Sequence, residues 1–332
     1  MIKHANISVF VPHLGCPNMC SFCNQHYIAG TQGMPNSSDI ENAVNVAQSS
    51  KNYNPKNTEL AFFGGSFTAI EFSYMLSLLK SANKFVKQGV IAGIRISTRP
   101  DAINAEILSV LKEYGVTSIE LGAQSMDDNV LALNKRGHTA LDVKNASALI
   151  KEHGFSLGLQ MMTGLYGDNN ETAINTAKEI IALRPNTVRI YPTIVLENTM
   201  LANLYKQGKY SPQGLEQAVN LAAELLDMFN KENITVIRVG LHTIDQTKYV
   251  AGPWHPAFRE LCESAIYLKN IKPLLNAKGE YNVFVKNGAV SKMAGQKRSN
   301  LVALENLGYK CKILEDNSLN DFQIKVQKVG KS

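Results

Sequence analysis

The chain has 332 residues, of which 45% are apolar and 19% charged, and its formal net charge is +6. These fractions are ordinary for a globular protein. No run of about 18 apolar residues is present, which excludes a membrane-spanning helix, and the apolar run near the N-terminus is too short for a signal peptide. We therefore expect a cytoplasmic protein with no membrane contact, in which clustered cysteines indicate metal or redox chemistry rather than disulfides.

Six short apolar runs follow one another in the first two thirds of the chain, each succeeded by an amphipathic helical pattern. The runs are rich in β-forming residues and mostly continuous in hydrophobicity, which suits a sheet buried on both faces. Strand–helix alternation predicts an α/β fold whose parallel strands form a closed barrel, a partial barrel or an open sheet, and six units are too few for a closed eight-stranded barrel. The expected strands are residues 7–12, 60–65, 91–98, 118–125, 155–162 and 188–193.

Local signals set the expected limits of the helices between these strands. Ser38 and Glu41 have the spacing of a capping box at the start of the first helix. Gly115 and Gly154 follow the third and fourth helices, as glycine often does at a helix C-terminus, and the fifth helix ends before Pro185.

The pattern changes after residue 194. A long helix (211–233), a strand (234–242) and another helix (255–271) are expected there. A small α+β unit follows, in which we expect strands at 281–286, 309–315 and 322–326 and one helix at 291–308. We therefore divide the chain into residues 1–277 and a C-terminal unit of residues 278–332.

Nearly all of the excess positive charge lies in the C-terminal unit. Between Tyr281 and Ser332 there are nine Lys or Arg residues and four acidic residues, a balance of +5. Such a unit can bind a polyanion such as RNA, and a solvated lysine-rich surface would have the same composition.

Three cysteines, Cys16, Cys20 and Cys23, form a C-x3-C-x2-C motif directly after the first expected strand. A structural zinc site would need a fourth ligand, which only His13 or His26 could supply nearby. A redox pair would not need Cys16. A 4Fe-4S cluster held by three cysteines leaves one iron open to a substrate or cofactor, and the spacing favours this interpretation.

With Phe22 before its last cysteine, the motif resembles that of the radical S-adenosylmethionine (SAM) superfamily. The segments FFGGSFT, ISTRPDAI, LGAQSMDDNVLALNKRGHT and RIYPTIVLENTM extend the resemblance over roughly residues 5–260. They are most similar to the radical domain of the Elongator catalytic subunit, and more distantly to oxygen-independent coproporphyrinogen oxidase. The resemblance implies a partial (β/α)6 barrel and a 4Fe-4S cluster that reductively cleaves SAM, so that hydrogen is abstracted from a substrate.

The resemblance also implies roles for individual residues. The cluster ligands would be Cys16, Cys20 and Cys23. The backbone of Phe22 would meet the adenine of SAM, and Gly64, Gly65 and Ser66 would surround its methionyl amino group.

Four more residues correspond to polar contacts with SAM. Ser97 occupies a position that contacts the cofactor in the porphyrinogen-oxidising relatives, and Gln124 and Arg136 match contacts to the ribose and the methionyl carboxylate. The planar fork of arginine suits that carboxylate. Gln160 stands where relatives have an Asp that binds the ribose hydroxyls.

The catalytic side chain stays open among Tyr191, His255 and Cys262. Tyr191 is either barrel packing or a substrate-facing phenol, and His255 lies either in a helix start or, beside Trp254, in a cap over the barrel mouth. Cys262 is either a buried thiol or a hydrogen donor. Arg238 and His242 end a late strand and are further candidates for substrate contact.

The resemblance and the basic unit together favour tRNA or another RNA as substrate, with an electron donor as partner. A haem-binding carrier and an enzyme acting on a small metabolite are the alternatives. About 70 residues follow Pro256, too few for the acetyltransferase domain of the Elongator subunits, so we do not expect acetyl transfer by this chain alone. The sequence assigns no oligomeric state.

Overall fold

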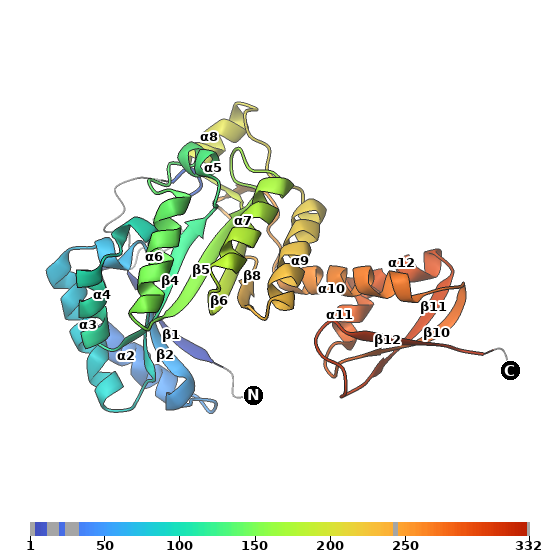
Figure 1. Cartoon of the computed structure of the whole chain (residues 1–332), viewed down its shortest axis with the longest axis horizontal. Coiled ribbons are helices and arrows are strands. Elements are labelled where there is room, and N and C mark those ends of the chain that lie inside the picture. The colour runs from blue at the N-terminus through green and yellow to red at the C-terminus, as the bar shows by residue number, and fades with distance from the viewer. Residues whose placement is uncertain (1–3, 12–19, 24–32, 242–244, 331–332) are drawn as a thin grey trace.

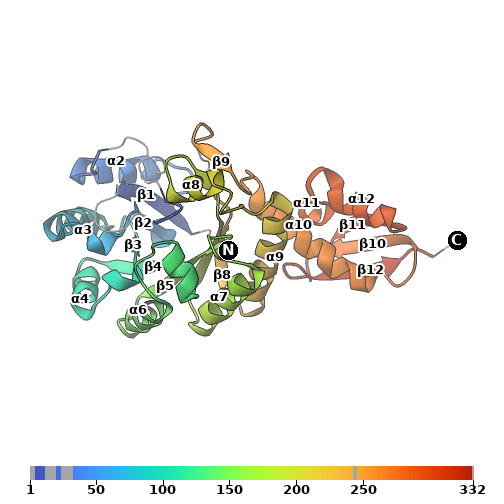
Figure 2. The same cartoon turned by 90° about the horizontal axis from the view of Figure 1, so that it is seen from above.

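A sheet of seven parallel strands, curled into a half-barrel, forms the larger part of the molecule (Figures 1 and 2). The computed structural model describes residues 4–11, 20–23, 33–241 and 245–330. The strands are ordered β1-β2-β3-β4-β5-β6-β8, so strands that follow one another along the chain are neighbours in this sheet. Their bounds are Ala5–Val11 (β1), Thr58–Gly64 (β2), Gly93–Thr98 (β3), Val116–Gln124 (β4), Ser156–Thr163 (β5), Thr187–Pro192 (β6) and Thr235–Val239 (β8).

The first six of these strands confirm the predicted ones to within two residues at each end. The seventh, β8, was expected as a late strand without a place in the barrel, and it pairs with β6 in parallel. Helix α9 (Leu215–Lys231) makes this possible, because its buried apolar side packs on β6 and β8 and returns the chain in the parallel direction. The half-barrel therefore has one strand more than a (β/α)6 unit.

Helices cover the outer face of the half-barrel (Figure 2). They are α2 (Ser37–Gln48), α3 (Phe72–Lys87), α4 (Ala105–Glu113), α6 (Ala140–Glu152), α7 (Asn170–Ala182) and α9. Within the described part of the chain, none of the helices combines the length and the apolar character needed to cross a membrane.

The start of α2 corrects the predicted capping box. The helix begins at Ser37 and its N-cap is Asn36, whose side chain accepts from the backbone N–H of Ser38 (2.8 Å). Asp39 completes the box by accepting from the backbone N–H of Asn36 (2.8 Å). Asparagine caps helices as well as serine does, so the earlier start is equally favourable.

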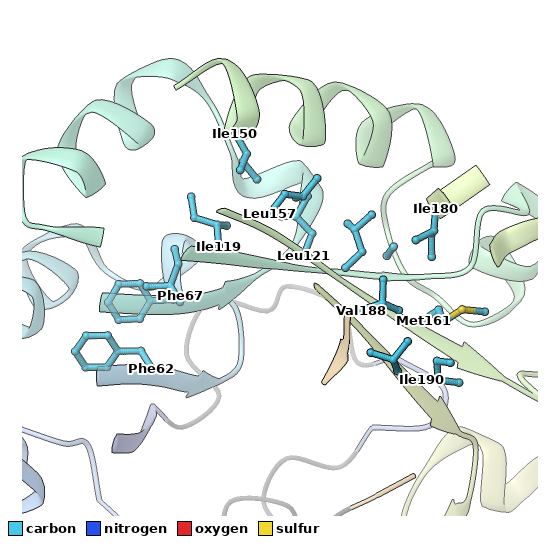
Figure 3. Close-up of a cluster of buried hydrophobic side chains, with 14 of the residues drawn as sticks. Phe62, Phe67, Ile119, Leu121, Ile150, Leu157, Met161, Ile180, Val188 and Ile190 are labelled. Carbon is cyan, nitrogen blue, oxygen red and sulfur yellow. The ribbon is translucent and has the colours of Figure 1, made fainter. Parts of the chain in front are cut away.

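The hydrophobic core lies between the outer face of the sheet and these helices (Figure 3). Alternate strand residues such as Ile119, Leu121 and Leu157 point toward Ile150 of α6 and are buried. The other alternate residues face the inside of the half-barrel, and several are charged. The sheet is buried on both faces, as expected, but its inner face buries charged residues such as Arg95, Glu120 and Arg189 rather than a continuous apolar surface.

The C-terminal unit contains a second, mixed sheet with the strand order β11-β10-β12. Its strands are Gly279–Val285 (β10), Tyr309–Glu315 (β11) and Ile324–Lys328 (β12). Instead of one helix over 291–308, two short helices occur, Val290–Ala294 (α11) and Ser299–Asn306 (α12). Gly295 ends the first with φ +77°, and a Cβ there would lie 2.4 Å from the hydroxyl of Ser299, so the backbone turns at this point.

Helix α10 (Phe258–Ile271) joins the two sheets and takes part in both cores (Figure 1). Phe258, Cys262 and Ile266 are buried in the core of the half-barrel, whereas Tyr267 and Ile271 are buried in the core of the C-terminal unit. The division proposed at residue 277 falls after this shared helix.

Candidate active site

The segment Cys20–Cys23 is held in place by two elements that are distant in the sequence. The backbone N–H of Ser21 donates to the carbonyl oxygen of Asn134 (3.1 Å), and its buried hydroxyl donates to the side-chain oxygen of Asn134 (2.5 Å). Asn134 caps α5 (Asp128–Leu133). On the other side, the N–H of Leu201 in α8 (Met200–Lys206) donates to the carbonyl of Ser21 (2.8 Å). Cys16 lies outside the described residues, so its role as third ligand stays a prediction.

Arg136 lies against this segment, as the predicted site requires. Its Nη1 donates to the sulfur of Cys20 (3.0 Å) and its Nη2 to the carbonyl oxygen of Gly122 (2.8 Å). The residue is 7% exposed, and its Nε has no hydrogen-bond partner among the described residues. Positive charge beside a cysteine sulfur matches the thiolate form in which cysteine binds iron.

Gly64 and Gly65 bring backbone close to the end of β1. Gly64 has φ +126°, and a Cβ at this position would lie 2.0 Å from the carbonyl oxygen of Val11, so no other residue fits. Ser66 follows and is buried, at 1% exposure. Gly65 and Ser66, together with Phe63 and Ser97, line a narrow recess at the carboxyl ends of β1, β2 and β3.

The buried polar atoms that lack partners among the described residues include two at the same edge of the sheet, near Gly64, namely the hydroxyl of Ser97 and the side-chain oxygen of Gln124. Gln124 also has φ +66°, next to an irregularity in the pairing of β4 with β5. Buried polar atoms without partners and strained backbone are both unfavourable, and both occur often at ligand-binding sites.

Phe22 contributes its side chain to a small apolar cluster beside the cysteines. It packs with Val195, Leu201 and Tyr210. The hydroxyl of Tyr210 donates to the carbonyl oxygen of Gly164 (2.7 Å). This packing orients the backbone of Phe22. The family resemblance predicts that this backbone contacts the adenine of SAM.

The inner face of the half-barrel carries a buried ionic network that we did not identify from the sequence. Arg95 donates to Glu59 (2.8 Å) and to Glu120 (2.9 Å), and Arg189 donates to Glu120 (2.9 Å). Gln160 donates to Glu120 as well (3.1 Å), which joins a predicted SAM contact to the network.

The pKa of Glu59 reflects opposing effects of burial and of its partners in this network. Burial raises its pKa, but Arg95 and the hydroxyls of Thr117 and Ser118 outweigh burial and hold the pKa below its ordinary value. The sequence did contain a signal for the network, because Arg95, Glu120 and Arg189 each stand alone between apolar neighbours in a strand.

The three candidates for a catalytic side chain lie in different surroundings. Tyr191 is on the inner face, where Arg189 donates to its hydroxyl (3.4 Å), and burial raises its pKa. His255 accepts from the N–H of Ala257 (3.1 Å). Cys262 is fully buried in the core, and burial raises the pKa of its thiol to about 12, so it is protonated and packs as an apolar residue.

His255 belongs to a loop that crosses the end of the sheet. The loop runs from β9 (Tyr249–Ala251), which pairs with β7 (Val195–Leu196), to the start of α10. A Cβ on Gly252 would lie 3.0 Å from the Cα of Ile194, just beyond β6. His255 thus precedes α10 rather than lying in its first turn, and a cap over the mouth of the half-barrel stays a prediction. His242 lies outside the described residues.

Two family models match the chain. The Radical SAM superfamily matches residues 10–180, and the Radical_SAM C-terminal domain matches residues 185–268. The chain belongs to the radical SAM superfamily. Its cofactors are those of the superfamily, a 4Fe-4S cluster and SAM.

Individual relatives of this radical SAM protein share parts of its length. The tRNA uridine(34) acetyltransferase of Dehalococcoides mccartyi (strain CBDB1) is 25% identical over 254 residues, which are 66% of this chain and 55% of the relative. Human Elongator complex protein 3 is 36% identical over 137 residues, which are 40% of this chain and 25% of the relative. The chain thus spans about half or less of the length of these relatives.

A solved structure shows the same fold. The archaeal Methanocaldococcus infernus Elp3 with an N-terminal deletion superposes with a TM-score of 0.68 at 23% identity, and the match covers 82% of this chain and 65% of that chain. Parallel strands curled into a half-barrel, with a further C-terminal unit, are thus the radical SAM fold in this chain as well.

The described residues of this radical SAM protein suit SAM by their chemistry. The guanidinium of Arg136 has an unused N–H at the carboxyl edge of the sheet. The side-chain oxygens of Ser97 and Gln124 are buried there without partners, and Gly64 brings the ends of β1 and β2 close together. A zwitterionic methionyl group with a ribose could use each of these groups. The roles of Arg136, Ser97 and Gln124 as contacts of SAM therefore stay predictions that their surroundings support.

Proposed function

We propose that this chain is a tRNA-modifying enzyme that reductively cleaves SAM and abstracts a hydrogen atom from its substrate. The observation that carries the catalytic part is the position of Arg136, whose guanidinium lies 3.0 Å from a sulfur of the cysteine motif while its Nε stays unpartnered. The tRNA part is supported by relatives named as tRNA uridine(34) acetyltransferases.

Residues of the chain prepare the site for its cofactors. Cys16, Cys20 and Cys23 would hold a 4Fe-4S cluster, which when bound supplies the electron that splits SAM into methionine and a 5′-deoxyadenosyl radical. Arg136 would bind the methionyl carboxylate, for which its planar fork is suited. Gly64, which lets the end of β2 lie close to the carbonyl oxygen of Val11, would position the backbone beside the amino group.

Other residues keep the site rigid and shielded. Asn134 fixes the Cys20–Cys23 segment through two hydrogen bonds, which limits movement of the ligands. Phe22 and the loop around Trp254 would exclude water from the carboxyl edge of the sheet, and a shielded site protects a reactive radical from side reactions.

The open face of the C-terminal sheet offers a surface for RNA. Strand residues that alternate with the buried core residues bring Lys312 and Lys325 to this face, beside Phe284. Within the described chain neither lysine forms a close ion pair, although Lys325 helps to lower the pKa of Asp316, whereas Lys310 pairs with Glu280 (2.9 Å). Lysines that flank an aromatic ring on a sheet suit phosphate contact and base stacking.

Two experiments test the two parts of this proposal separately. Anaerobically reconstituted protein with dithionite is expected to release methionine and 5′-deoxyadenosine, and the Cys20→Ser variant is expected to lose this activity. An unaltered yield in the Cys20→Ser variant would contradict the assigned cluster site.

The tRNA part is tested by binding and by product analysis. We expect tRNA binding to weaken steeply with salt and to be reduced at least tenfold by the pair Lys312→Glu and Lys325→Glu, but far less by Lys80→Glu and Lys87→Glu on α3. Mass spectrometry of tRNA nucleosides, with and without the protein in cells, is expected to show one altered nucleoside. If both double variants bind tRNA equally well, the C-terminal sheet is not the tRNA-binding surface.

A further inference from the structure

Arg238 is a cation on the inner face of the half-barrel for which the chain provides no acidic partner. The strand register places it beside Arg189, on the same face as the ionic network. Among the described residues it has neither an ion pair nor a hydrogen bond through its side chain. Every Asp and Glu of the sequence lies in the described part, so no acidic side chain elsewhere in the chain is left to pair with it.

The neighbours of Arg238 increase the positive charge around it. Arg189 is already bonded to Glu120. Arg259, in the first turn of α10, is bonded to Glu263 (2.9 Å) and to the carbonyl oxygen of Val236 (2.9 Å). Burial lowers the pKa of Arg238, Arg189 and Arg259 lower it further, and Tyr191 opposes them. A guanidinium stays charged in proteins, so this environment is unfavourable for the free protein.

The charges of the inner face do not balance. Glu59 and Glu120 supply two negative charges, and Arg95, Arg189 and Arg238 supply three positive ones, which leaves +1. Arg238 is half-buried at the β8 edge of the sheet, across the half-barrel from the cysteine segment and Gly64. The subsite that Arg238 offers is thus separate from the residues expected to hold the cofactors.

We propose that Arg238 and the hydroxyl of Tyr191 form a subsite for an anionic group of the substrate, a carboxylate or a phosphate. The fork of Arg238 can donate two parallel hydrogen bonds to such a group. Tyr191 accepts from Arg189, which leaves its own proton free to donate. Of the proposed function, this inference uses only the statement that a substrate enters the half-barrel.

The loop before α10 is anchored beside the two strands that carry the proposed subsite. It begins against Ile194, beyond β6, and ends where Phe258 packs on Gly240, beyond β8. Tyr191 and Arg238 belong to these same two strands. The substrate's anionic group would thus lie under the loop that contains Trp254 and His255, and its reactive part would extend toward the cofactor edge at β1–β4.

The test measures the thermal stability of reconstituted holoprotein in buffers of constant ionic strength, with inorganic phosphate or acetate as the probe. Without either anion, Arg238→Gln is expected to melt about 2 °C higher than the wild type, because an unpaired, half-buried charge is removed. Phosphate or acetate is expected to raise the melting temperature of the wild type. The apparent affinity for the anion, obtained from this shift, should fall at least tenfold in Arg238→Gln and by a smaller factor in Tyr191→Phe.

Arg298→Gln is the matched control, since it removes one exposed arginine from the basic C-terminal unit. It should retain the response of the wild type. A stronger response to phosphate supports a phosphate group in the substrate, and a stronger response to acetate supports a carboxylate. The proposal is overturned if Arg238→Gln melts lower than the wild type, or if the anions stabilise it equally. These measurements require neither SAM cleavage nor tRNA, so the subsite and the proposed function can fail independently.

Discussion

Replacing Arg95 by Met removes the cation that lies between Glu59 and Glu120 on the inner face. The residue is 6% exposed, and its side chain donates one charge-assisted hydrogen bond to each carboxylate, at 2.8 and 2.9 Å. Breaking a buried ion pair costs about 3–5 kcal/mol, because the remaining charge stays buried without a partner. Two hydrogen bonds to charged groups, each about 1.5–3 kcal/mol, sum to about 3–6 kcal/mol, which overlaps this range. We therefore expect the free energy of unfolding to fall by about 3–5 kcal/mol.

The pH dependence of this loss identifies its cause. In the wild type the pKa of Glu59 is held below its ordinary value, so its contribution is present above the unfolded-state pKa of about 4.3 and is lost as the pH falls through the folded-state pKa. Without Arg95, the largest of the contributions that lower the pKa of Glu59 is lost, so this pKa rises relative to the wild type. The variant then takes up a proton at a higher pH than the wild type, so the difference in stability should be largest near neutral pH and should narrow toward acid pH.

Urea unfolding of anaerobic protein, followed by circular dichroism at pH 7.5, 6 and 5, measures both effects. Lys144→Met is the matched control, since Lys144 pairs with Glu179 at 2.6 Å but both side chains are about half exposed. It should cost less than about 1 kcal/mol. A loss below about 1 kcal/mol for Arg95→Met, or one independent of pH, would refute the view that this arginine compensates buried negative charge.

Three other changes probe the site. Gly64→Ala should abolish SAM binding in equilibrium dialysis, because its methyl group would lie 2.0 Å from the carbonyl oxygen of Val11, whereas Gly33→Ala, with nothing within 4 Å, should bind normally. Burial, aided by Arg136, lowers the pKa of His138 to about 4, so the unfolded state, with a pKa near 6.5, binds more protons between these values. From pH 7 to pH 5 the wild type should lose about 2 kcal/mol more stability in urea unfolding than His138→Gln, and an equal loss would argue against a buried neutral imidazole. Arg136→Gln should weaken SAM binding at least tenfold in the same dialysis assay while cluster absorbance persists, and unchanged affinity would exclude the carboxylate contact.

The strands of the half-barrel were predictable because each is a short β-rich apolar run followed by a helix. The signals at Gly115 and Gly154 were also local, and both residues have positive φ, at +78° and +80°. The three-cysteine motif and Gly64 could be placed at the carboxyl edge for the same reason, since the ends of parallel strands meet there.

Features that depend on pairing between distant segments were not predictable. The inner-face network joins Glu120 to Arg95 and Arg189, which are 25 and 69 residues away in the sequence, and only the sheet register brings them together. Asn134 reaches Ser21 across 113 residues. The place of β8 beside β6 likewise depends on how α9 packs, which no short segment determines.

The continuous helix α10 sets a fixed geometry between the two halves of the molecule. A helix of 14 residues is about 21 Å long, and its two ends are buried in different cores, so it acts as a rigid spacer rather than a hinge. A nucleic acid lying on Lys312 and Lys325 would be kept at a constant separation from the mouth of the half-barrel. Only a nucleotide at a matching distance along a folded RNA could then reach the reactive centre, so the length of this helix would itself select the position that is modified.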